Sequence, residues 1–230
     1  MKGVALITAR SGSKGFKNKN IAKINNKTLI EYAVASVENS VHIDEVFIST
    51  DSKQYENIAL MAGAKTQGLR PNFLSTDTAK SIDVVRNFLQ KFGNEKPDYV
   101  VLLQPTSPQR TVEQIDECIG IHLNMNQSVV SVSKIDEPHP YKMKLINEMG
   151  NITPFVGGAS SDVPRQMLPP VYSLTGAIYV ASTECILNEG SFFSSMTKPY
   201  ITPNFTNIDS EDDYLYLKYL VDTGKVSLEC

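Results

Sequence analysis

Residues 4–15 of this chain read Val4-Ala5-Leu6-Ile7-Thr8-Ala9-Arg10-Ser11-Gly12-Ser13-Lys14-Gly15. The apolar, β-rich start predicts a buried strand, and the polar, glycine-containing remainder predicts a turn directly after it. Seven cations and no anion precede Glu31, namely Lys2, Arg10, Lys14, Lys17, Lys19, Lys23 and Lys27. The chain has 22 Lys+Arg against 25 Asp+Glu, so this positive charge is local. A cationic turn rich in Ser and Gly favours a compact, highly charged anion such as a triphosphate.

Apolar strands alternate with helical patterns along most of the chain. Strands are predicted at 4–7, 46–50, 99–103, 128–133 and 176–180, and helices at 29–37, 54–62, 111–123 and 211–222, with a further helix capped by Ser81. The run at 99–103 is apolar without alternation, as expected for a strand buried on both faces. The order predicts a three-layer α/β/α, Rossmann-like fold with a mostly parallel sheet. Ligands in such sheets bind at the carboxyl ends of strands, so the turn after the first strand is the expected anion site.

The strand–helix alternation lapses between about 136 and 172. Six prolines fall in this segment, at Pro138, Pro140, Pro154, Pro164, Pro169 and Pro170. The segment is too long for a simple connection, and it predicts either a functional lid or an arm used in assembly. We therefore expect one domain over 1–230 with an insertion at about 136–172.

Several function classes are disfavoured. Phe16 follows Gly15, so no GxxxxGK[ST] motif is present, and GxGxxG is also missing, which argues against P-loop NTPases and dinucleotide-binding dehydrogenases. Apolar runs are too short to span a bilayer, and Arg10 comes too early for a signal peptide. The net charge of −3 disfavours nucleic acid. Three widely spaced cysteines (Cys118, Cys185, Cys230) predict reduced thiols in the cytoplasm. The histidines His42, His122 and His139 lack metal-ligand spacing.

Further short segments follow the cationic turn in a specific order. They are Lys17-Asn18-Lys19-Asn20, Arg70-Pro71 with 77–81, 103–110 (LQPTSPQR), His139-Pro140-Tyr141-Lys142, Arg165-Gln166, Gly176-Ala177-Ile178-Tyr179, Phe192-Phe193 and Asn207-Ile208-Asp209. With these segments the chain resembles the CMP-sialic acid synthetases (acylneuraminate cytidylyltransferases) over nearly its whole length. The resemblance implies transfer of CMP from CTP to the C2 hydroxyl of N-acetylneuraminic acid, with release of pyrophosphate.

The resemblance also implies roles for individual residues. CTP would be held by Arg10, Ser13, Lys14, Lys19, Asn20, Arg70 and Ser81. The sugar acid would meet Gln104, Lys142, Arg165, Tyr179, Phe192 and Phe193, with Lys142 and Arg165 reaching the partner's site across a homodimer. Asp209, with Asn207, would hold Mg²⁺ or Mn²⁺, and the catalytic set would be Arg10, Lys14, Lys19 and Asp209.

Alternatives stay open at this point. Phe192-Phe193 could be ordinary core, Gln104 could cap a strand end, and Arg165 could be a surface residue. The family usually has Asp-Ile-Asp where this chain has Asn207-Ile208-Asp209, and Asn where it has Thr175. These departures leave three alternatives to N-acetylneuraminic acid activation: legionaminic acid, pseudaminic acid, and a non-catalytic CTP-binding homologue.

Overall fold

A computed structural model describes residues 1–203 and 205–228. Its strands are β1 (Gly3–Thr8), β2 (Lys23–Ile24), β3 (Lys27–Thr28), β4 (Glu45–Ser49), β5 (Lys65–Thr66), β6 (Tyr99–Leu103), β7 (Val129–Ile135), β8 (Lys144–Ile146), β9 (Ile152–Pro154), β10 (Val171–Ser182) and β11 (Lys198–Thr202). The α-helices are α1 (Leu29–Ala35), α2 (Lys53–Met61), α3 (Ser81–Gln90), α4 (Val112–Met125), α5 (Thr183–Glu189) and α6 (Glu211–Asp222). Short 3₁₀ helices are η1 (Lys19–Ile21), η2 (Asn72–Leu74), η3 (Pro140–Lys142) and η4 (Arg165–Met167).

The central sheet confirms the predicted α/β fold. Over the described ranges it has seven strands in the order β11-β7-β10-β6-β1-β4-β5. Every neighbouring pair is parallel except the two made by β10, which runs antiparallel to β7 and to β6. In register, Ile7 of β1 lies beside Leu103 of β6, so the loops after these two strands leave the sheet side by side.

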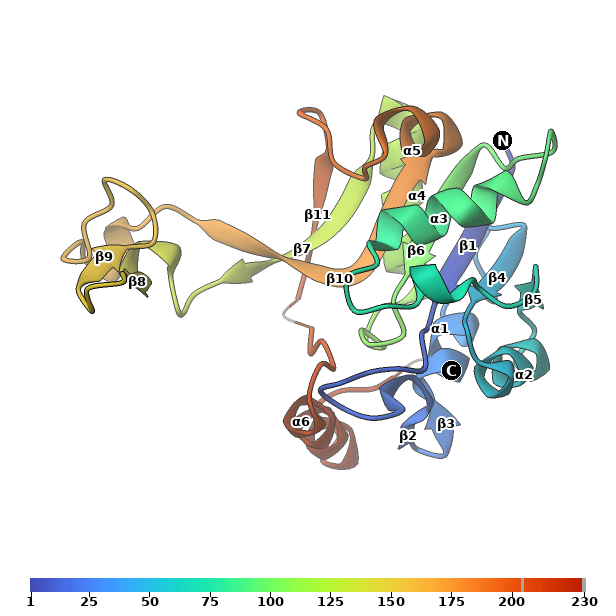
Figure 1. Cartoon of the computed structure of the whole chain (residues 1–230), viewed down its shortest axis with the longest axis horizontal. Coiled ribbons are helices and arrows are strands. Elements are labelled where there is room, and N and C mark those ends of the chain that lie inside the picture. The colour runs from blue at the N-terminus through green and yellow to red at the C-terminus, as the bar shows by residue number, and fades with distance from the viewer. Residues whose placement is uncertain (204, 229–230) are drawn as a thin grey trace.

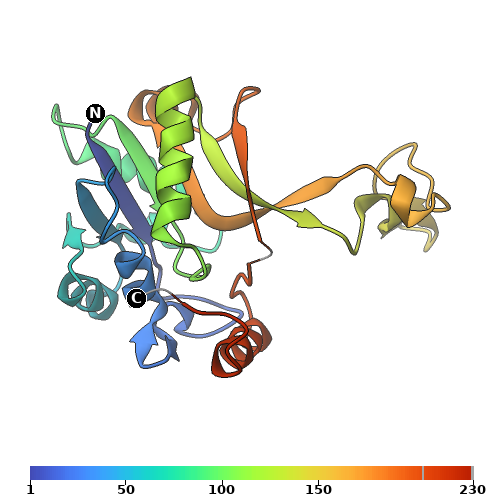
Figure 2. The same cartoon turned by 180° about the vertical axis from the view of Figure 1, so that it is seen from behind.

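Helices cover both faces of the sheet, as Figures 1 and 2 show from opposite sides. One face packs against α1, α2 and α4 through residues such as Ile30, Ala59 and Ile115. The other face packs against α3 and α5, where Phe88 and Ile186 are buried. This two-sided burial explains why residues 99–103 are continuously apolar.

A third, smaller cluster holds α6 to the hairpin of β2 and β3. It buries Ile24, Leu29, Ile208 and Leu217. Ser210 begins α6 with a capping box, because its side chain and that of Asp213 each accept from the other's backbone N–H. The cluster fixes the position of the segment just before α6, which contains Asp209.

The segment at 136–172 extends away from the sheet (Figure 1). Strands β7 and β10 run out from the body as its two legs, and β8 and β9 form a small antiparallel hairpin at the far end. His139 is 3% exposed and links the segment that follows β7 to the segment that precedes β10, since its Nε2 lies 3.0 Å from the Pro169 carbonyl oxygen. We call this segment the arm.

Some sequence predictions were wrong or incomplete. Ser81 is the first residue of α3 rather than its cap, because Lys80 has the extended backbone of the N-cap position and makes no side-chain cap bond. The strand predicted at 176–180 is longer, spanning 171–182, since its outer half pairs with β7 along the arm. The short elements α5 and β11 were not predicted. Within the described residues, no helix is long and apolar enough to cross a membrane.

Candidate active site

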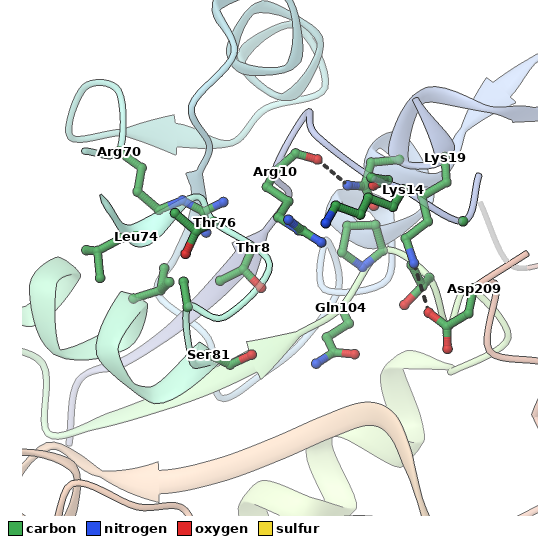
Figure 3. A pocket seen from close by; sticks show the side chains of 17 residues that line it. Thr8, Arg10, Lys14, Lys19, Arg70, Leu74, Thr76, Ser81, Gln104 and Asp209 are labelled. Atoms are coloured by element: carbon green, nitrogen blue, oxygen red, sulfur yellow. Dashed lines mark hydrogen bonds and ion pairs between the residues drawn. The ribbon is translucent and has the colours of Figure 1, made fainter. Parts of the chain in front are cut away.

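A cavity of about 340 Å³ lies at the carboxyl ends of β1 and β6 (Figure 3). Its lining comes from the loops after these strands, from the segment before α3 and from Asp209. The structure brings together nine of the residues predicted from the sequence: Arg10, Ser13, Lys14, Lys19, Asn20, Arg70, Ser81, Gln104 and Asp209. Thr8, Leu74, Thr76, Ala79 and Thr106 also line it, and the sequence analysis did not single them out.

The loop after β1 is held open by bonds to its neighbours. Ser11 donates to Asp51 through both its backbone N–H (2.8 Å) and its hydroxyl (3.0 Å). Asn20 is buried, and its amide donates to the Arg10 carbonyl oxygen at 3.0 Å, across the base of the loop. These bonds fix the backbone of the loop, whose cationic side chains line the cavity. The sequence analysis assigned no role to Asp51, so its support of this loop is visible only in the structure.

Three cations in and just after this loop, Arg10, Lys14 and Lys19, are each paired with a carboxylate. Arg10 Nη1 and Lys14 Nζ both lie 2.5 Å from oxygens of Asp77. Lys19 Nζ donates to Asp209 Oδ1 at 2.9 Å and to the Ile208 carbonyl oxygen at 3.0 Å. The bonds from Lys14 and Arg10 lower the pKa of the Asp77 carboxyl, so it is charged at neutral pH. The site therefore holds three cations on one side of a single cavity.

Arg70 is a fourth cation at the cavity, and it is 6% exposed. Its backbone N–H donates to the Thr50 carbonyl oxygen at 2.7 Å, and its Nε donates to Ser75 at 3.1 Å. Burial lowers the pKa of its guanidinium, which the nearby Asp51 opposes. A guanidinium in this setting has a fixed orientation and is suited to binding an anion through two donors.

The loop after β6 carries Gln104 and is built around Arg110. Arg110 is 1% exposed, and its Nη1 donates to the carbonyl oxygens of Gln104 (2.7 Å) and Ser107 (2.8 Å). Its Nε donates to Ser36 at 3.2 Å. Gly176 makes room for the loop, because it has φ +71° and a Cβ there would lie 2.8 Å from Gln104 Oε1. Gln104 is thereby held at the cavity wall.

Asp209 reaches the cavity from the other end of the chain. Gly15 allows the close approach of the two segments, since a Cβ at this position would lie 2.6 Å from the Asp209 carbonyl oxygen. Asn207 Nδ2 donates to Asp209 Oδ2 at 2.8 Å, and Ser107 donates to Asn207 Oδ1 at 3.4 Å. Asp213 serves as the capping partner of Ser210 and accepts from the Asp209 N–H.

The oxygen atoms around Asp209 suit a Mg²⁺ ion whose remaining ligands are phosphate and water oxygens. Among the described residues, no group of three or more His, Cys, Asp or Glu is placed to hold a metal ion. Mg²⁺ commonly takes one or two carboxylates from a protein and completes its shell with phosphate and water oxygens. Asp209 is largely exposed beside the cationic loop, so its carboxylate fits this pattern.

The residues predicted for the sugar acid fall in three places: Gln104 lines the cavity, whereas the aromatic residues and the two arm residues lie outside its lining. Tyr179 contacts Phe192 and Phe193, with ring centroids 5.5 and 6.3 Å away. Phe192 is buried in the core, as the simpler interpretation held, whereas Phe193 is exposed. Lys142 and Arg165 lie on the arm, both exposed and outside the cavity lining of their own chain. Arg165 lies 3.7 Å from Glu137.

Thr175 points away from solvent. It is 6% exposed, and its hydroxyl lies 2.6 Å from that of Ser131, which also bonds both backbone groups of Ile178. The Thr175 carbonyl oxygen accepts from Ser107 at 2.9 Å. The two positions that depart from the family pattern, 175 and 207, are therefore joined through Ser107.

Several known proteins resemble this chain in sequence and in fold. The model of the cytidylyltransferase family matches residues 4–147. CMP-N,N'-diacetyllegionaminic acid synthase of Legionella pneumophila is 34% identical over 99% of this chain and 100% of its own length. N-acylneuraminate cytidylyltransferase of Streptococcus agalactiae serotype V is 35% identical over 94% of this chain, which spans 52% of that relative. A solved CMP:2-keto-3-deoxy-manno-octonic acid synthetase complexed with CTP shares the fold, with TM-score 0.74 and 16% identity over 97% of this chain and 100% of its own.

Proposed function

This chain belongs to the cytidylyltransferase family and is a nucleotidyltransferase, and we propose that it transfers CMP from CTP to the C2 hydroxyl of N-acetylneuraminic acid. The observation that supports this most is the convergence of Arg10, Lys14, Lys19 and Arg70 on one cavity with Gln104 on its wall. Four cations suit a triphosphate, and an amide offers both a donor and an acceptor to a sugar.

In the proposed reaction, the C2 hydroxyl oxygen forms a bond to the α-phosphorus of CTP. The bond between that phosphorus and the bridging oxygen of the β-phosphate breaks, and pyrophosphate leaves. The hydroxyl proton is released to solvent or to the pyrophosphate. Positioning and charge neutralisation dominate such phosphoryl chemistry. Arg10, Lys14 and Lys19 would stabilise the charge on the departing pyrophosphate, while Gln104 would orient the sugar acid.

Mg²⁺ is the proposed metal, held by Asp209, with Asn207 as the second predicted ligand and Mn²⁺ as a possible substitute. When bound, it would neutralise part of the negative charge on the phosphate oxygens. Lys19 and Asn207 would hold the Asp209 carboxylate in place, because each donates to a different oxygen of it.

N,N'-Diacetyllegionaminic acid is the second candidate substrate. It is favoured by the relative that matches this chain along the full length of both proteins and is named for that product. Both acids carry acyl groups, for which the exposed Phe193 beside Tyr179 offers an apolar surface. We also propose a cytoplasmic location, because three widely spaced cysteines favour reduced thiols. Cys118 and Cys185 are free, and Cys230 lies outside the described residues.

The test is Mg²⁺-dependent release of pyrophosphate from CTP, with N-acetylneuraminic, N,N'-diacetyllegionaminic and pseudaminic acids supplied separately. We expect the highest kcat/KM with N-acetylneuraminic acid. A higher value with either other acid would move the proposal to that acid. CTP binding without release with any of the three would favour a non-catalytic homologue.

We also propose that the protein acts as a homodimer in which the arm completes the partner's site. The arm exposes several large apolar side chains, among them Ile146 (76%), Met149 (81%), Ile152 (70%) and Met167 (71%). Exposed apolar surface of this kind favours burial against another protein surface. Lys142 and Arg165 would then face the carboxylate of the sugar acid in the other protomer.

Mixing two variants of low activity tests this arrangement. Lys19→Ala impairs the cavity and Arg165→Ala impairs the arm, so a mixed dimer has one site with both residues intact only if the arm acts across the dimer. We expect the mixture to recover about a quarter of wild-type activity after exchange of subunits. No recovery, with dimers present in sedimentation, would place Arg165 in its own chain's site or outside any site.

A further inference from the structure

Asp77 binds the two cations that a phosphate group would use. Its Oδ1 lies 2.5 Å from Arg10 Nη1 and its Oδ2 lies 2.5 Å from Lys14 Nζ, so each carboxylate oxygen is matched to one cation. A phosphate group presents its oxygens to two cations in the same way. Arg10 and Lys14 line the cavity, whereas Asp77 belongs to a neighbouring segment of which Thr76 and Ala79 also line it.

That segment is anchored at both ends and exposed in the middle. At its start, Leu74 is buried and Ser75 is bonded to the Arg70 Nε and the Pro71 carbonyl oxygen. At its end, Ser81 begins α3. Between them, the Ala79 N–H donates to the Thr76 carbonyl oxygen at 3.3 Å, and Asp77 lies within this exposed turn. Within the described residues, the two ion pairs are the side-chain contacts that tie Asp77 to the loop after β1.

We propose that Asp77 is an internal competitor for the phosphate site, so that ligands bind Arg10 and Lys14 only by displacing it. This inference rests on the proposed function, which assigns phosphate binding to these two cations. A monophosphate replaces the two ion pairs of Asp77 with similar contacts to Arg10 and Lys14, so the net binding free energy of this exchange is small. A triphosphate also reaches Lys19 and Arg70, which Asp77 does not bind, so it displaces the carboxylate at a net gain. The same exchange in reverse would help pyrophosphate to leave.

Neutralising Asp77 should therefore tighten anion binding. Calorimetric titration with inorganic pyrophosphate, in EDTA so that no metal contributes, is compared between the wild type and Asp77→Asn. We expect the dissociation constant to fall by about three- to tenfold in the variant, in keeping with the size of two exposed ion pairs. The variant should also show a lower KM for CTP together with a lower kcat, because product leaves more slowly.

Two matched variants separate this effect from a change in total charge. Asp83→Asn removes the same charge from an exposed position in α3, and it should leave the dissociation constant within about 1.5-fold. Asp77→Glu keeps the carboxylate and should bind pyrophosphate closer to the wild type than Asp77→Asn does.

Three results would overturn the proposal. Equal binding by Asp77→Asn and wild type would show that the carboxylate does not compete. Weaker binding by Asp77→Asn would show that Asp77 supports the anion instead. Equal tightening in Asp77→Asn and Asp83→Asn would assign the effect to net charge. If neither pyrophosphate nor CTP binds to the wild type, the proposed function itself fails, and the competition fails with it.

Discussion

The loops after β1 and β6 leave neighbouring parallel strands at the same edge of the sheet, yet they use arginine in opposite ways. Arg10 is partly exposed and paired with a carboxylate that is itself exposed. Arg110 is fully buried and bonded to hydroxyl and carbonyl oxygens. Burial lowers the pKa of Arg110 to about 9, so it still carries its charge at neutral pH.

The difference shows how one edge of a sheet can carry a loop that binds an anion and another whose conformation is fixed from within. An exposed ion pair costs little to break, so Arg10 can exchange Asp77 for another anion. A buried guanidinium that donates to backbone carbonyl oxygens is costly to displace, because the buried groups would lose hydrogen bonds that water cannot replace. We infer that the first loop binds ligand charge, while the second sets where Gln104, Ser107 and their contacts lie.

The strongest test of this contrast is Arg110→Met. The substitution removes the guanidinium donor from the carbonyl oxygens of Gln104 and Ser107, and the Gln104 oxygen keeps only the longer bond from the Ser107 N–H. We expect the free energy of unfolding to fall by about 2–4 kcal/mol in urea titrations. Arg86→Met, at an exposed position of α3, is the matched control and should change it by less than about 0.5 kcal/mol. Equal effects of the two variants would mean that Arg110 is not a structural anchor.

Lys19→Ala should have the opposite profile, with a large effect on activity and a small one on stability. Loss of one charge-assisted phosphate contact is worth about 1.5–3 kcal/mol, so kcat/KM for CTP should fall by about 10- to 150-fold. Steady-state kinetics measures this, with the exposed Lys17→Ala as the control for a charge lost from the same loop. Activity within twofold of wild type would remove Lys19 from the site.

Asn207→Asp tests the residue that links the two loops, because Asn207 contacts both Ser107 of the loop after β6 and Asp209, the partner of Lys19. The change replaces the donor to Asp209 by a second carboxylate, which repels Asp209 without metal and adds a ligand with it. We expect the Mg²⁺ concentration at half-maximal activity to fall by about three- to tenfold.

Thermal unfolding gives a readout of Asn207→Asp that does not depend on turnover. The variant should be less stable than wild type in EDTA and should gain more stability from added Mg²⁺. The Asp212→Asn variant is a control for carboxylate number near α6. Unchanged Mg²⁺ dependence of both activity and unfolding would exclude residue 207 as a ligand.

The smallest expected effect is that of ionic strength. Raising salt from about 50 to 300 mM screens the exposed cations, so KM for CTP should rise by about two- to fivefold. The contacts of Arg110 are screened much less, because water and ions do not reach them. The unfolding midpoint should therefore move little over the same range. A KM independent of salt would argue against an electrostatic role for the loop after β1.

Much of the fold could be predicted because its signals are local. The buried strands at 4–7 and 99–103 are apolar over consecutive residues, and β1 and β6 are found there. The cationic turn was also visible in sequence, and its predicted residues line the cavity. The short elements α5 and β11 were missed because they have no continuous apolar run, and five to seven residues of mixed polarity carry too little periodicity to be distinguished from loop.

The sequence by itself determined the alternation of strands and helices along most of the chain, the charge of the first turn and the family. Tertiary structure alone decided which groups meet. Lys19 and Asp209 are 190 positions apart, Ser11 and Asp51 are 40 apart, and Ser107 and Thr175 are 68 apart. Such contacts depend on strand register and on the packing of α6, and no local pattern encodes either. For the same reason, the sequence marked Asp77 as one motif residue among several, and only the folded chain places it on Arg10 and Lys14.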